Sequence, residues 1–209
     1  RLCRRDAGEG GGADRAALVD VDSLSPEEFE FFTLAAQRQL PNLIVASPKD
    51  EQEARCLLRT AFGQAHPFAL HYPRDPGLDL PAVEPTPIPV DQGELLRVGA
   101  DVLIVGFGPI VMRALAAADA LAAEGWSASA INARFAKPLD RELILRHAAG
   151  KRLVITVEES VVSGGFGSGV LELLAEAALA DPALRGIPVR VIGLPADRFV
   201  DHGSVSDLR

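Results

Sequence analysis

One stretch decides the fold of this chain: Glu158-Glu159-Ser160-Val161-Val162-Ser163-Gly164-Gly165-Phe166-Gly167-Ser168-Gly169. An apolar run at 153–157 precedes it, and a segment rich in alanine and leucine, 170–179, follows it. This order predicts a buried strand, a glycine loop and a helix, which together form the repeating unit of an α/β sheet. The free amides at the start of that helix are expected to face an anion or a neighbouring carboxylate.

The same alternation extends to both sides of this stretch. Apolar runs predict four strands, at 101–106, 126–132, 153–157 and 189–192. We expect a helix at 109–124 with Met112, Leu115 and Leu121 toward the sheet, and a second helix from the N-cap Asp140 to residue 147. Strands that alternate with helices predict a mainly parallel sheet of the α/β class.

The first part of the chain predicts a shorter α/β unit. Ser25 and Pro26 mark the start of a helix that runs to about residue 39, and Ser47 is the expected N-cap of a helix that includes Phe62. Short apolar runs at 43–46 and 68–72 predict two strands. Five prolines between residues 76 and 92 exclude a helix or a central strand there.

These segments divide the chain into four parts. We expect a mobile head at 1–22, because it is rich in glycine and lacks apolar periodicity. A partial α/β domain at 23–80 follows, then a proline-rich linker at 81–94 and a second α/β domain at 95–209. A further short helix is expected at 204–207.

Composition narrows the function classes. The chain has 209 residues, 48% of them apolar, and a net charge of −8, which argues against a large nucleic-acid footprint. No apolar run reaches the roughly 18 residues that a membrane span requires. The two cysteines and four histidines show no metal-ligand spacing, so no metal site is predicted and a reducing cytoplasm fits best.

The motifs that follow the predicted strands differ in how strongly they indicate a functional site. The glycines at 165–169 lack the spacing of the G-x-G-x-x-G fingerprint for dinucleotides, so a structural or interface role is expected for this loop. Glu158 and Glu159 are adjacent and point to different sides of a strand, which makes them a poor acid/base pair. We expect one carboxylate to cap nearby amides and the other to be solvated.

His71-Tyr72-Pro73-Arg74 is a sharper signal. It lies where a predicted strand ends against prolines, so Arg74 leaves the sheet on a rigid backbone. A guanidinium in that place suits a bidentate grip on phosphate or carboxylate. A surface ion pair with Asp75 or Asp79 explains the same arginine equally well.

Several of these pieces occur together and in order in one family. The segment 41–51, PNLIVASPKDE, resembles the corresponding segment of thiamine-diphosphate enzymes of the transketolase group. Further segments resemble the 1-deoxy-D-xylulose-5-phosphate synthase family. They are YPR at 72–74, NARFAKPLD at 132–140, TVEE at 156–159 with GGFGSG at 164–169, GLPADRF at 193–199 and HG at 202–203. The resemblance covers roughly residues 40–209, and the combination is specific although each piece alone is not.

The resemblance implies a complete transketolase C-terminal-type domain, preceded by the end of a pyrimidine-binding-type domain. It implies a transferase that condenses pyruvate with glyceraldehyde 3-phosphate, releases CO2 and serves isoprenoid, thiamine and pyridoxal phosphate synthesis. Thiamine diphosphate and Mg2+ are the implied cofactors, and a homodimer is the implied assembly. Arg74 matches an arginine that grips the substrate phosphate, with Tyr72 and Pro73 positioning it. Arg134, Lys137 and Asp140 match positions with an expected structural or interdomain role.

The departures from the family pattern bear on activity. Residues 1–40 contain neither an Asp-Arg-Ala-Gly stretch nor a Gly-Ala-Asp-Gly-x-Thr-His segment, and the residues that bind the cofactor and magnesium are not found. Asp75 replaces the usual glycine and sets a carboxylate beside Arg74. We therefore expect the chain alone to be inactive. The alternatives are a beta-type subunit of a 2-oxo-acid dehydrogenase and a non-catalytic dimerisation or regulatory module.

Overall fold

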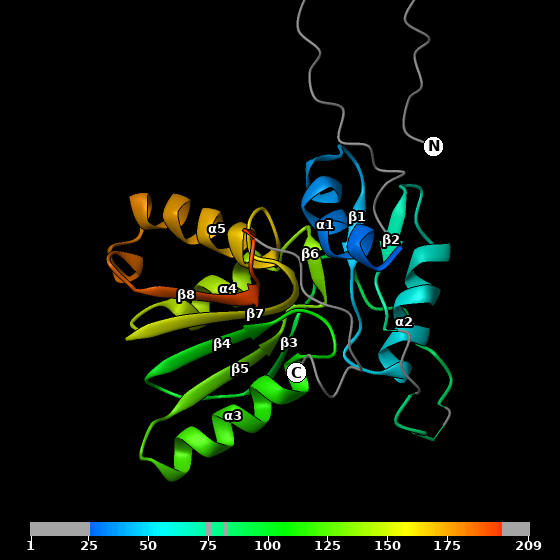
Figure 1. Cartoon of the computed structure of the whole chain (residues 1–209). Coiled ribbons are helices and arrows are strands. Elements are labelled where there is room, and N and C mark those ends of the chain that lie inside the picture. The colour runs from blue at the N-terminus through cyan, green and yellow to red at the C-terminus, as the bar shows by residue number, and fades with distance from the viewer. Residues whose placement is uncertain (1–25, 74–76, 82, 198–209) are drawn as a thin grey trace, which may run out of the picture.

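The computed structural model of this chain describes residues 26–73, 77–81 and 83–197. They form two sheets, a five-stranded one in the order β3-β5-β4-β7-β8 and a three-stranded one in the order β2-β1-β6. Figure 1 shows the two sheets side by side, with helices packed on each. The predicted head at 1–22 and the predicted helix at 204–207 lie outside the described residues.

The larger sheet confirms the predicted α/β class. Its strands are β3 (Glu94–Arg97), β4 (Val102–Gly106), β5 (Ala128–Asn132), β7 (Leu153–Val161) and β8 (Val189–Leu194). The strands β5, β4, β7 and β8 pair in parallel, and β3 joins the β5 edge antiparallel. The sequence did not predict β3, because its four residues follow the prolines and carry charge at both ends.

Helices cover this sheet from both sides. α3 (Val111–Ala123) lies on one face, and α4 (Arg141–Ala148) and α5 (Phe166–Ala180) lie on the other, as Figure 1 shows. A short 3-10 helix, η2 (Pro182–Leu184), follows α5. The predicted cap of α4 is confirmed, because the Asp140 carboxylate accepts a hydrogen bond from the amide of Leu143 at 2.9 Å.

The face that α3 presents to the sheet differs from the prediction. Val111, Ala114 and Ala118 are buried, whereas Met112 is 43% exposed. Buried positions at i, i+3 and i+7 define one face of a helix, and Met112 lies about 100° around the axis from Val111. The expectation that Met112 points to the sheet was therefore wrong.

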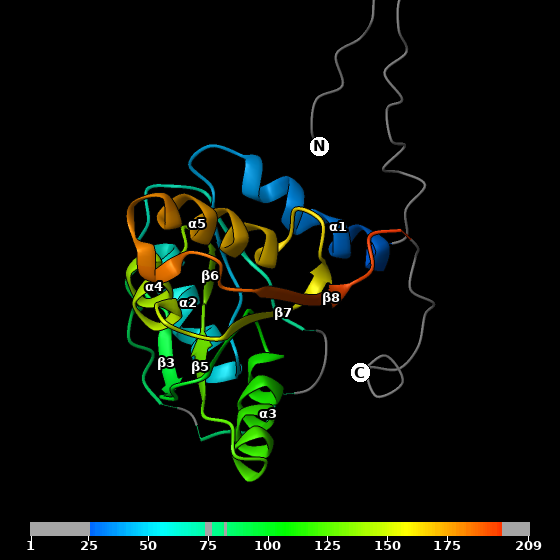
Figure 2. The same cartoon turned by 90° about the vertical axis from the view of Figure 1, so that its left-hand side faces the viewer.

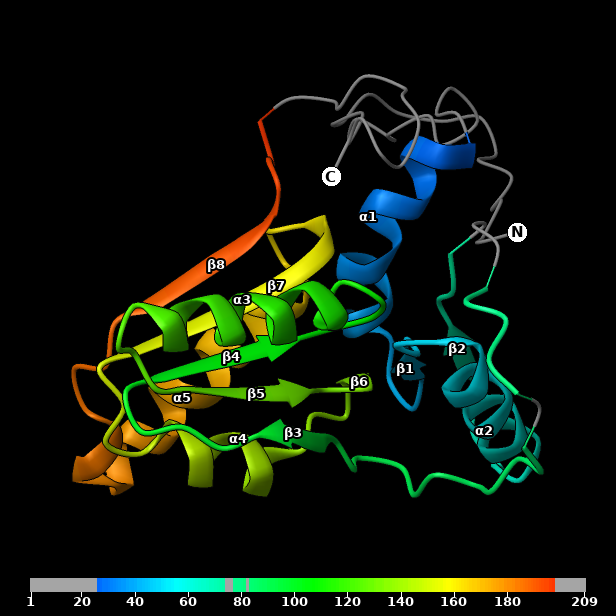
Figure 3. The same ribbon diagram turned by 90° about the horizontal axis from the view of Figure 1, so that it is seen from below.

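The smaller unit combines elements from the first part of the sequence with one strand from further along the chain. It contains α1 (Pro26–Gln39), β1 (Ile44–Ala46), α2 (Glu51–Phe62) and β2 (Phe68–Leu70). β1 pairs in parallel with β2 and antiparallel with β6 (Phe135–Lys137), which arrives from the larger unit. Figure 3 shows the carboxyl ends of β4 and β5 pointing toward this unit. The main core is shared, because Leu34 and Val45 belong to the same cluster as Val105 and Phe166.

The start of α2 corrects a second expectation. Its N-cap is Asp50, whose carboxylate accepts a hydrogen bond from the amide of Glu53 at 2.7 Å. Ser47 lies before the helix, and its hydroxyl donates instead to the carbonyl of His71. Ser47 and Asp50 both have capping side chains, and the tertiary contact at Ser47 decides between them.

The described residues between 77 and 92 form no helix or strand, as the five prolines predicted, whereas the last residue of the expected linker, Glu94, begins β3. The proline-rich segment is nevertheless held against α2, because the hydroxyl of Thr60 accepts a hydrogen bond from the amide of Ile88 at 2.7 Å and lies 2.8 Å from its carbonyl. Across the described part of the chain, no helix has the length and apolar character of a membrane span.

Candidate functional site

The segment that leads to Arg74 begins at an anchored residue, His71. The His71 amide donates to the carbonyl of Ala46 at 2.8 Å, and its own carbonyl accepts from the hydroxyl of Ser47 at 2.9 Å. Its ring nitrogen Nε2 lies 2.6 Å from Oε1 of Gln37 on α1. The backbone just after β2 is therefore held by the end of β1, and the His71 ring is held by α1.

The two residues predicted to hold substrate lie directly after this anchor. Tyr72 is 70% exposed, so its ring is free to meet a ligand at the surface. Arg74 lies outside the described residues, and its predicted grip on phosphate stays a prediction. The structure places Tyr72 at the surface directly after the anchored strand end, and its contact with substrate stays a prediction.

A buried charge cluster joins the two units close to this anchor. The Glu53 side chain, 2% exposed, accepts hydrogen bonds from Nε of Arg134 at 2.6 Å and from Nδ2 of Asn132 at 3.0 Å. Lys49 donates to Glu53 through its amide at 2.7 Å and to Glu94 through its ammonium at 2.8 Å. Each buried charge thus meets an opposite charge, which offsets the cost of removing it from water.

Electrostatics within the cluster favour the charged forms. Burial alone would raise the pKa of Glu94, but the hydrogen bond and charge of Lys49 and the charge of Arg134 outweigh it and hold that pKa below its usual value. Burial likewise acts to lower the pKa of Lys49, and the Glu94 and Glu53 carboxylates reverse the shift and raise it. The cluster is therefore an ionic junction between the two units.

The expected structural role of three motif residues is confirmed by these contacts. Arg134 bonds to Glu53 as described, and the ammonium of Lys137 donates to the carbonyl of Leu40. The second carboxylate oxygen of Asp140 accepts from the amide of Gly93 at 2.9 Å. Arg134 and Lys137 connect the two units, and Asp140 fixes the segment before β3 to α4.

The glycine loop binds its own carboxylate. Glu158, 3% exposed, accepts hydrogen bonds from the amides of Phe166 at 2.7 Å and Gly167 at 2.8 Å, and from the hydroxyl of Ser160. Burial raises the pKa of Glu158, and these three donors only partly offset the effect. The prediction that one carboxylate caps nearby amides is confirmed, whereas Glu159 is half-buried and not fully solvated.

The other side of the loop is held by a residue that the sequence did not single out. Arg38 on α1 donates to the carbonyls of Gly164 at 2.6 Å and Gly165 at 2.7 Å, and pairs with Glu172 at 3.0 Å. Figure 2 shows α1 lying beside the loop that leads into α5. The contact spans 126 positions in sequence, so no local pattern identifies it. The loop therefore has a structural interface role.

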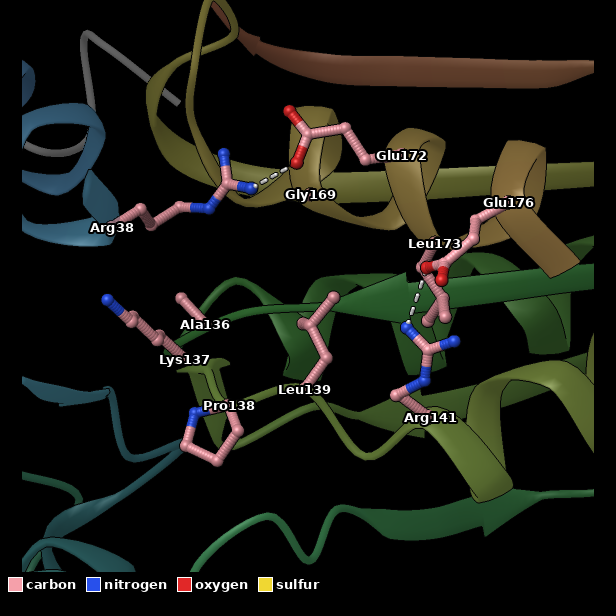
Figure 4. Close-up of a pocket in the computed structure, with 10 residues that line it drawn as sticks. All are labelled: Arg38, Ala136, Lys137, Pro138, Leu139, Arg141, Gly169, Glu172, Leu173 and Glu176. Carbon is pink, nitrogen blue, oxygen red and sulfur yellow. Dashed lines mark hydrogen bonds and ion pairs between the residues drawn. The ribbon is translucent and has the colours of Figure 1, made fainter. Parts of the chain in front are cut away.

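A shallow cleft of about 290 Å³ opens between α1, α5 and the segment after β6. Figure 4 shows Arg38, Lys137 and Arg141 around it, with Arg38 directed toward Glu172 and Arg141 toward Glu176. The three cations are engaged by protein oxygens, since Arg141 pairs with Glu176 at 3.1 Å and the other two bond to backbone carbonyls. The cleft is a seam between the two units.

The described residues do not fit a thiamine-diphosphate and magnesium site. Within them, no three His, Cys, Asp or Glu side chains gather as metal ligands. Among the described residues, the buried carboxylates are those of Glu53 and Glu158, and both already accept hydrogen bonds from protein donors. A cofactor with a charged diphosphate requires free amides, cations or a bound metal ion, and none of the groups described above offers them.

Comparison with known proteins now places this architecture. Residues 91–208 match the transketolase C-terminal domain family, so the chain belongs to that family. Its relatives are more specific: the 1-deoxy-D-xylulose-5-phosphate synthase of Thermomicrobium roseum is 48% identical over 198 residues, which cover 94% of this chain and 30% of the relative. The chain therefore spans less than a third of the length of the synthase it matches.

A second relative extends the match into the head. The synthase of Listeria welshimeri is 42% identical over 98% of this chain and 31% of its own length, so the match includes most of residues 1–22. Asp14-Arg15-Ala16-Ala17 lies there and keeps three of the four residues of the Asp-Arg-Ala-Gly stretch. The exact Asp-Arg-Ala-Gly stretch is absent from residues 1–40, as expected, although three of its four residues are present in order.

A solved structure extends the comparison. A protein described as a split gene transketolase in an inactive beta4 tetramer is 33% identical, with a TM-score of 0.65. The match covers 78% of this chain and 52% of that one. The fold described here is thus the transketolase fold.

Proposed function

We propose that this chain is the C-terminal part of a 1-deoxy-D-xylulose-5-phosphate synthase. In the intact enzyme it would take part in condensing pyruvate with glyceraldehyde 3-phosphate, with loss of CO2. The observation that carries this proposal is the 48% identity with the Thermomicrobium roseum synthase across 94% of the chain. Relatives at this level that cover nearly the whole chain favour one function over the wider transketolase group.

The proposal divides the work between this chain and the rest of the enzyme. Thiamine diphosphate and Mg2+ are held by residues elsewhere in the intact enzyme, and thiamine diphosphate supplies the carbanion chemistry when bound. Residues 23–80 form part of a pyrimidine-binding-type domain, 81–94 a linker and 95–209 the C-terminal domain. The intact enzyme is a homodimer and works in the reducing cytoplasm.

Within this chain, Tyr72 and Arg74 form the substrate contact. The His71 anchor, bonded to Ala46 and Ser47, holds the strand end from which both residues extend. A guanidinium on a fixed backbone binds a phosphate with two parallel hydrogen bonds. Asp75 places a carboxylate beside Arg74, which weakens that grip relative to a glycine.

The chain alone is expected to be inactive, because it contributes positioning groups and no cofactor site among its described residues. The test is a turnover assay with pyruvate, glyceraldehyde 3-phosphate, thiamine diphosphate and magnesium. We expect no 1-deoxy-D-xylulose 5-phosphate from the isolated chain. Product formed by the chain alone would refute this part of the proposal.

A second candidate is a subunit of a two-chain thiamine-diphosphate enzyme, such as a beta-type chain of a 2-oxo-acid dehydrogenase. The similar solved structure favours it, because that protein is described as split gene and inactive as a beta4 tetramer. Co-purification of this chain with a separate cofactor-binding chain would support the second candidate. Activity of the two chains on glyceraldehyde 3-phosphate would return the assignment to the synthase.

A further inference from the structure

Ser47 lies at the junction of the two units and bonds to both. Its amide donates to the carbonyl of Arg134 at 2.8 Å, and its hydroxyl donates to the carbonyl of His71 at 2.9 Å. Arg134 belongs to the turn between β5 and β6, and His71 follows β2. Ser47 therefore connects the second half of the sequence, through its amide, to the strand end that carries Tyr72, through its hydroxyl.

Gly108 of the larger unit leaves room for the Ser47 hydroxyl. It follows β4 with φ of +83°, and a Cβ built there would lie 2.7 Å from Oγ of Ser47. A side chain at position 108 would be strained by the positive φ and would push the hydroxyl away. The position of the hydroxyl therefore requires a glycine at this place in the larger unit.

The turn that accepts the Ser47 amide is itself held firmly. Arg134 has a φ of +58°, which is uncommon for a residue with a side chain. Its amide donates to Oδ1 of Asn132 at 3.2 Å, and its guanidinium bonds to the buried Glu53. The carbonyl that fixes Ser47 therefore has a defined position set by the charge cluster.

We propose that Ser47 is a positioning residue that fixes the His71 carbonyl and, through it, the exposed residues Tyr72 and Pro73 that follow. The larger unit acts on these residues through Arg134 and Gly108 without touching a ligand. That Tyr72 contacts substrate rests on the proposed function above. The anchoring itself rests on the contacts of Ser47 alone.

The test compares Ser47→Ala with a matched control, Ser168→Ala, in the whole chain. The Ser168 hydroxyl donates to the carbonyl of Val162 at 2.8 Å and is also part-buried, but it lies on α5. Hydrogen exchange at individual amides is read by NMR. We expect Ser47→Ala to speed exchange of the His71 amide by about threefold to tenfold, because losing the hydrogen bond to the His71 carbonyl loosens the strand end, while Ser168→Ala leaves the exchange unchanged.

Two results overturn the anchoring. One is an unchanged exchange rate of the His71 amide in Ser47→Ala. The other is an equal increase in the exchange rates of the β4 amides, which would mean that the substitution destabilises the whole chain. Gly108→Ala provides a second variant, because its added Cβ displaces the hydroxyl while Ser47 stays in place. It should speed His71 exchange as Ser47→Ala does.

A titration with glyceraldehyde 3-phosphate, followed at the Tyr72 amide, separates this inference from the proposed function. If the unmodified chain does not bind glyceraldehyde 3-phosphate but Ser47→Ala speeds exchange of the His71 amide, the proposed phosphate binding is wrong and the anchoring by Ser47 is supported. If the chain binds and Ser47→Ala binds threefold to tenfold more weakly, both stand. Equal binding by the chain and by Ser47→Ala would overturn the positioning role.

Discussion

Nε of Arg134 lies 2.6 Å from Oε1 of Glu53, although 81 positions separate the two residues in sequence. The pair joins the turn after β5 to helix α2, and Lys49 and Asn132 complete its hydrogen bonds. Through this pair the larger unit fixes the turn that supports Ser47. The stability of the junction between the units therefore depends on a buried ion pair.

Removing one partner of this pair should be costly. Arg134→Met leaves the Glu53 carboxylate buried with fewer donors, and we expect a loss of about 3–5 kcal/mol in the free energy of unfolding in urea. Arg146→Met is the control, because the Arg146–Glu142 pair is exposed at 60% and 83% and contributes at most about 0.5 kcal/mol. Equal losses in the two variants would contradict a buried ionic junction.

The contact between Arg38 and the glycine loop predicts a difference in the rate of proteolysis. Arg38→Ala removes hydrogen bonds to the carbonyls of Gly164 and Gly165. A hydrogen bond to a charged group contributes about 1.5–3 kcal/mol to the free energy of unfolding, and less when one donor nitrogen serves two carbonyls, as it does here. Limited proteolysis in the loop 162–165 should become faster. Arg141→Ala, which breaks the exposed Arg141–Glu176 pair, should leave the cleavage rate unchanged. The same rate in all three proteins would show that α1 does not hold the loop.

Glu158 predicts a pH dependence of stability with a defined sign. Burial raises the pKa of Glu158 above its ordinary value of 4.5, so the folded chain binds this proton more tightly than the unfolded chain. The Glu158 contribution to the free energy of unfolding is therefore fully present below pH 4.5 and is lost as pH rises through the raised pKa.

The measurement is the difference in urea unfolding free energy between the unmodified chain and Glu158→Gln at several pH values. Other titrations largely cancel in this difference, which should fall as pH increases above the ordinary carboxyl range. Ser129→Ala removes no titratable group and should give a difference that is flat with pH. A difference for Glu158→Gln that increases with pH would reverse the assigned sign.

Thr156 predicts a stabilising substitution. Among the described residues, its hydroxyl is the buried side-chain polar atom without a hydrogen-bond partner. Thr156→Val keeps the shape and removes that hydroxyl, so we expect a gain of about 1 kcal/mol in the free energy of unfolding. Ser129→Ala is the opposite control, because its buried hydroxyl donates to Gly99 at 2.9 Å and its removal should destabilise the chain. A loss on Thr156→Val would contradict the unpaired state of this hydroxyl.

The sequence predicted the elements that carry strong local patterns. The alternation of apolar runs and helices identified β4, β5, β7 and β8, and Asp140 identified the start of α4. It missed β6, whose three residues precede Pro138 and become a strand only by pairing with β1. Short strands of this kind depend on tertiary contacts that local patterns do not contain.

The site was less predictable for the same reason. The sequence marked Tyr72, Arg74 and Glu158, but assigned Ser47 to a helix cap. The actual partners of Ser47 are His71 and Arg134, at distances in sequence that no motif spacing records. Long-range hydrogen bonds of this kind become visible when the two units are placed together.

The account depends most on the claim that this chain completes a synthase and grips the sugar phosphate through Arg74. The most direct measurement joins this chain to the remaining part of the Thermomicrobium roseum synthase, in place of the segment that it matches, and follows 1-deoxy-D-xylulose 5-phosphate. The account predicts activity in the chimera, and a KM for glyceraldehyde 3-phosphate that Arg74→Ala raises about tenfold or more while the KM for pyruvate stays constant. A folded chimera without product, or equal changes in both KM values, would contradict it.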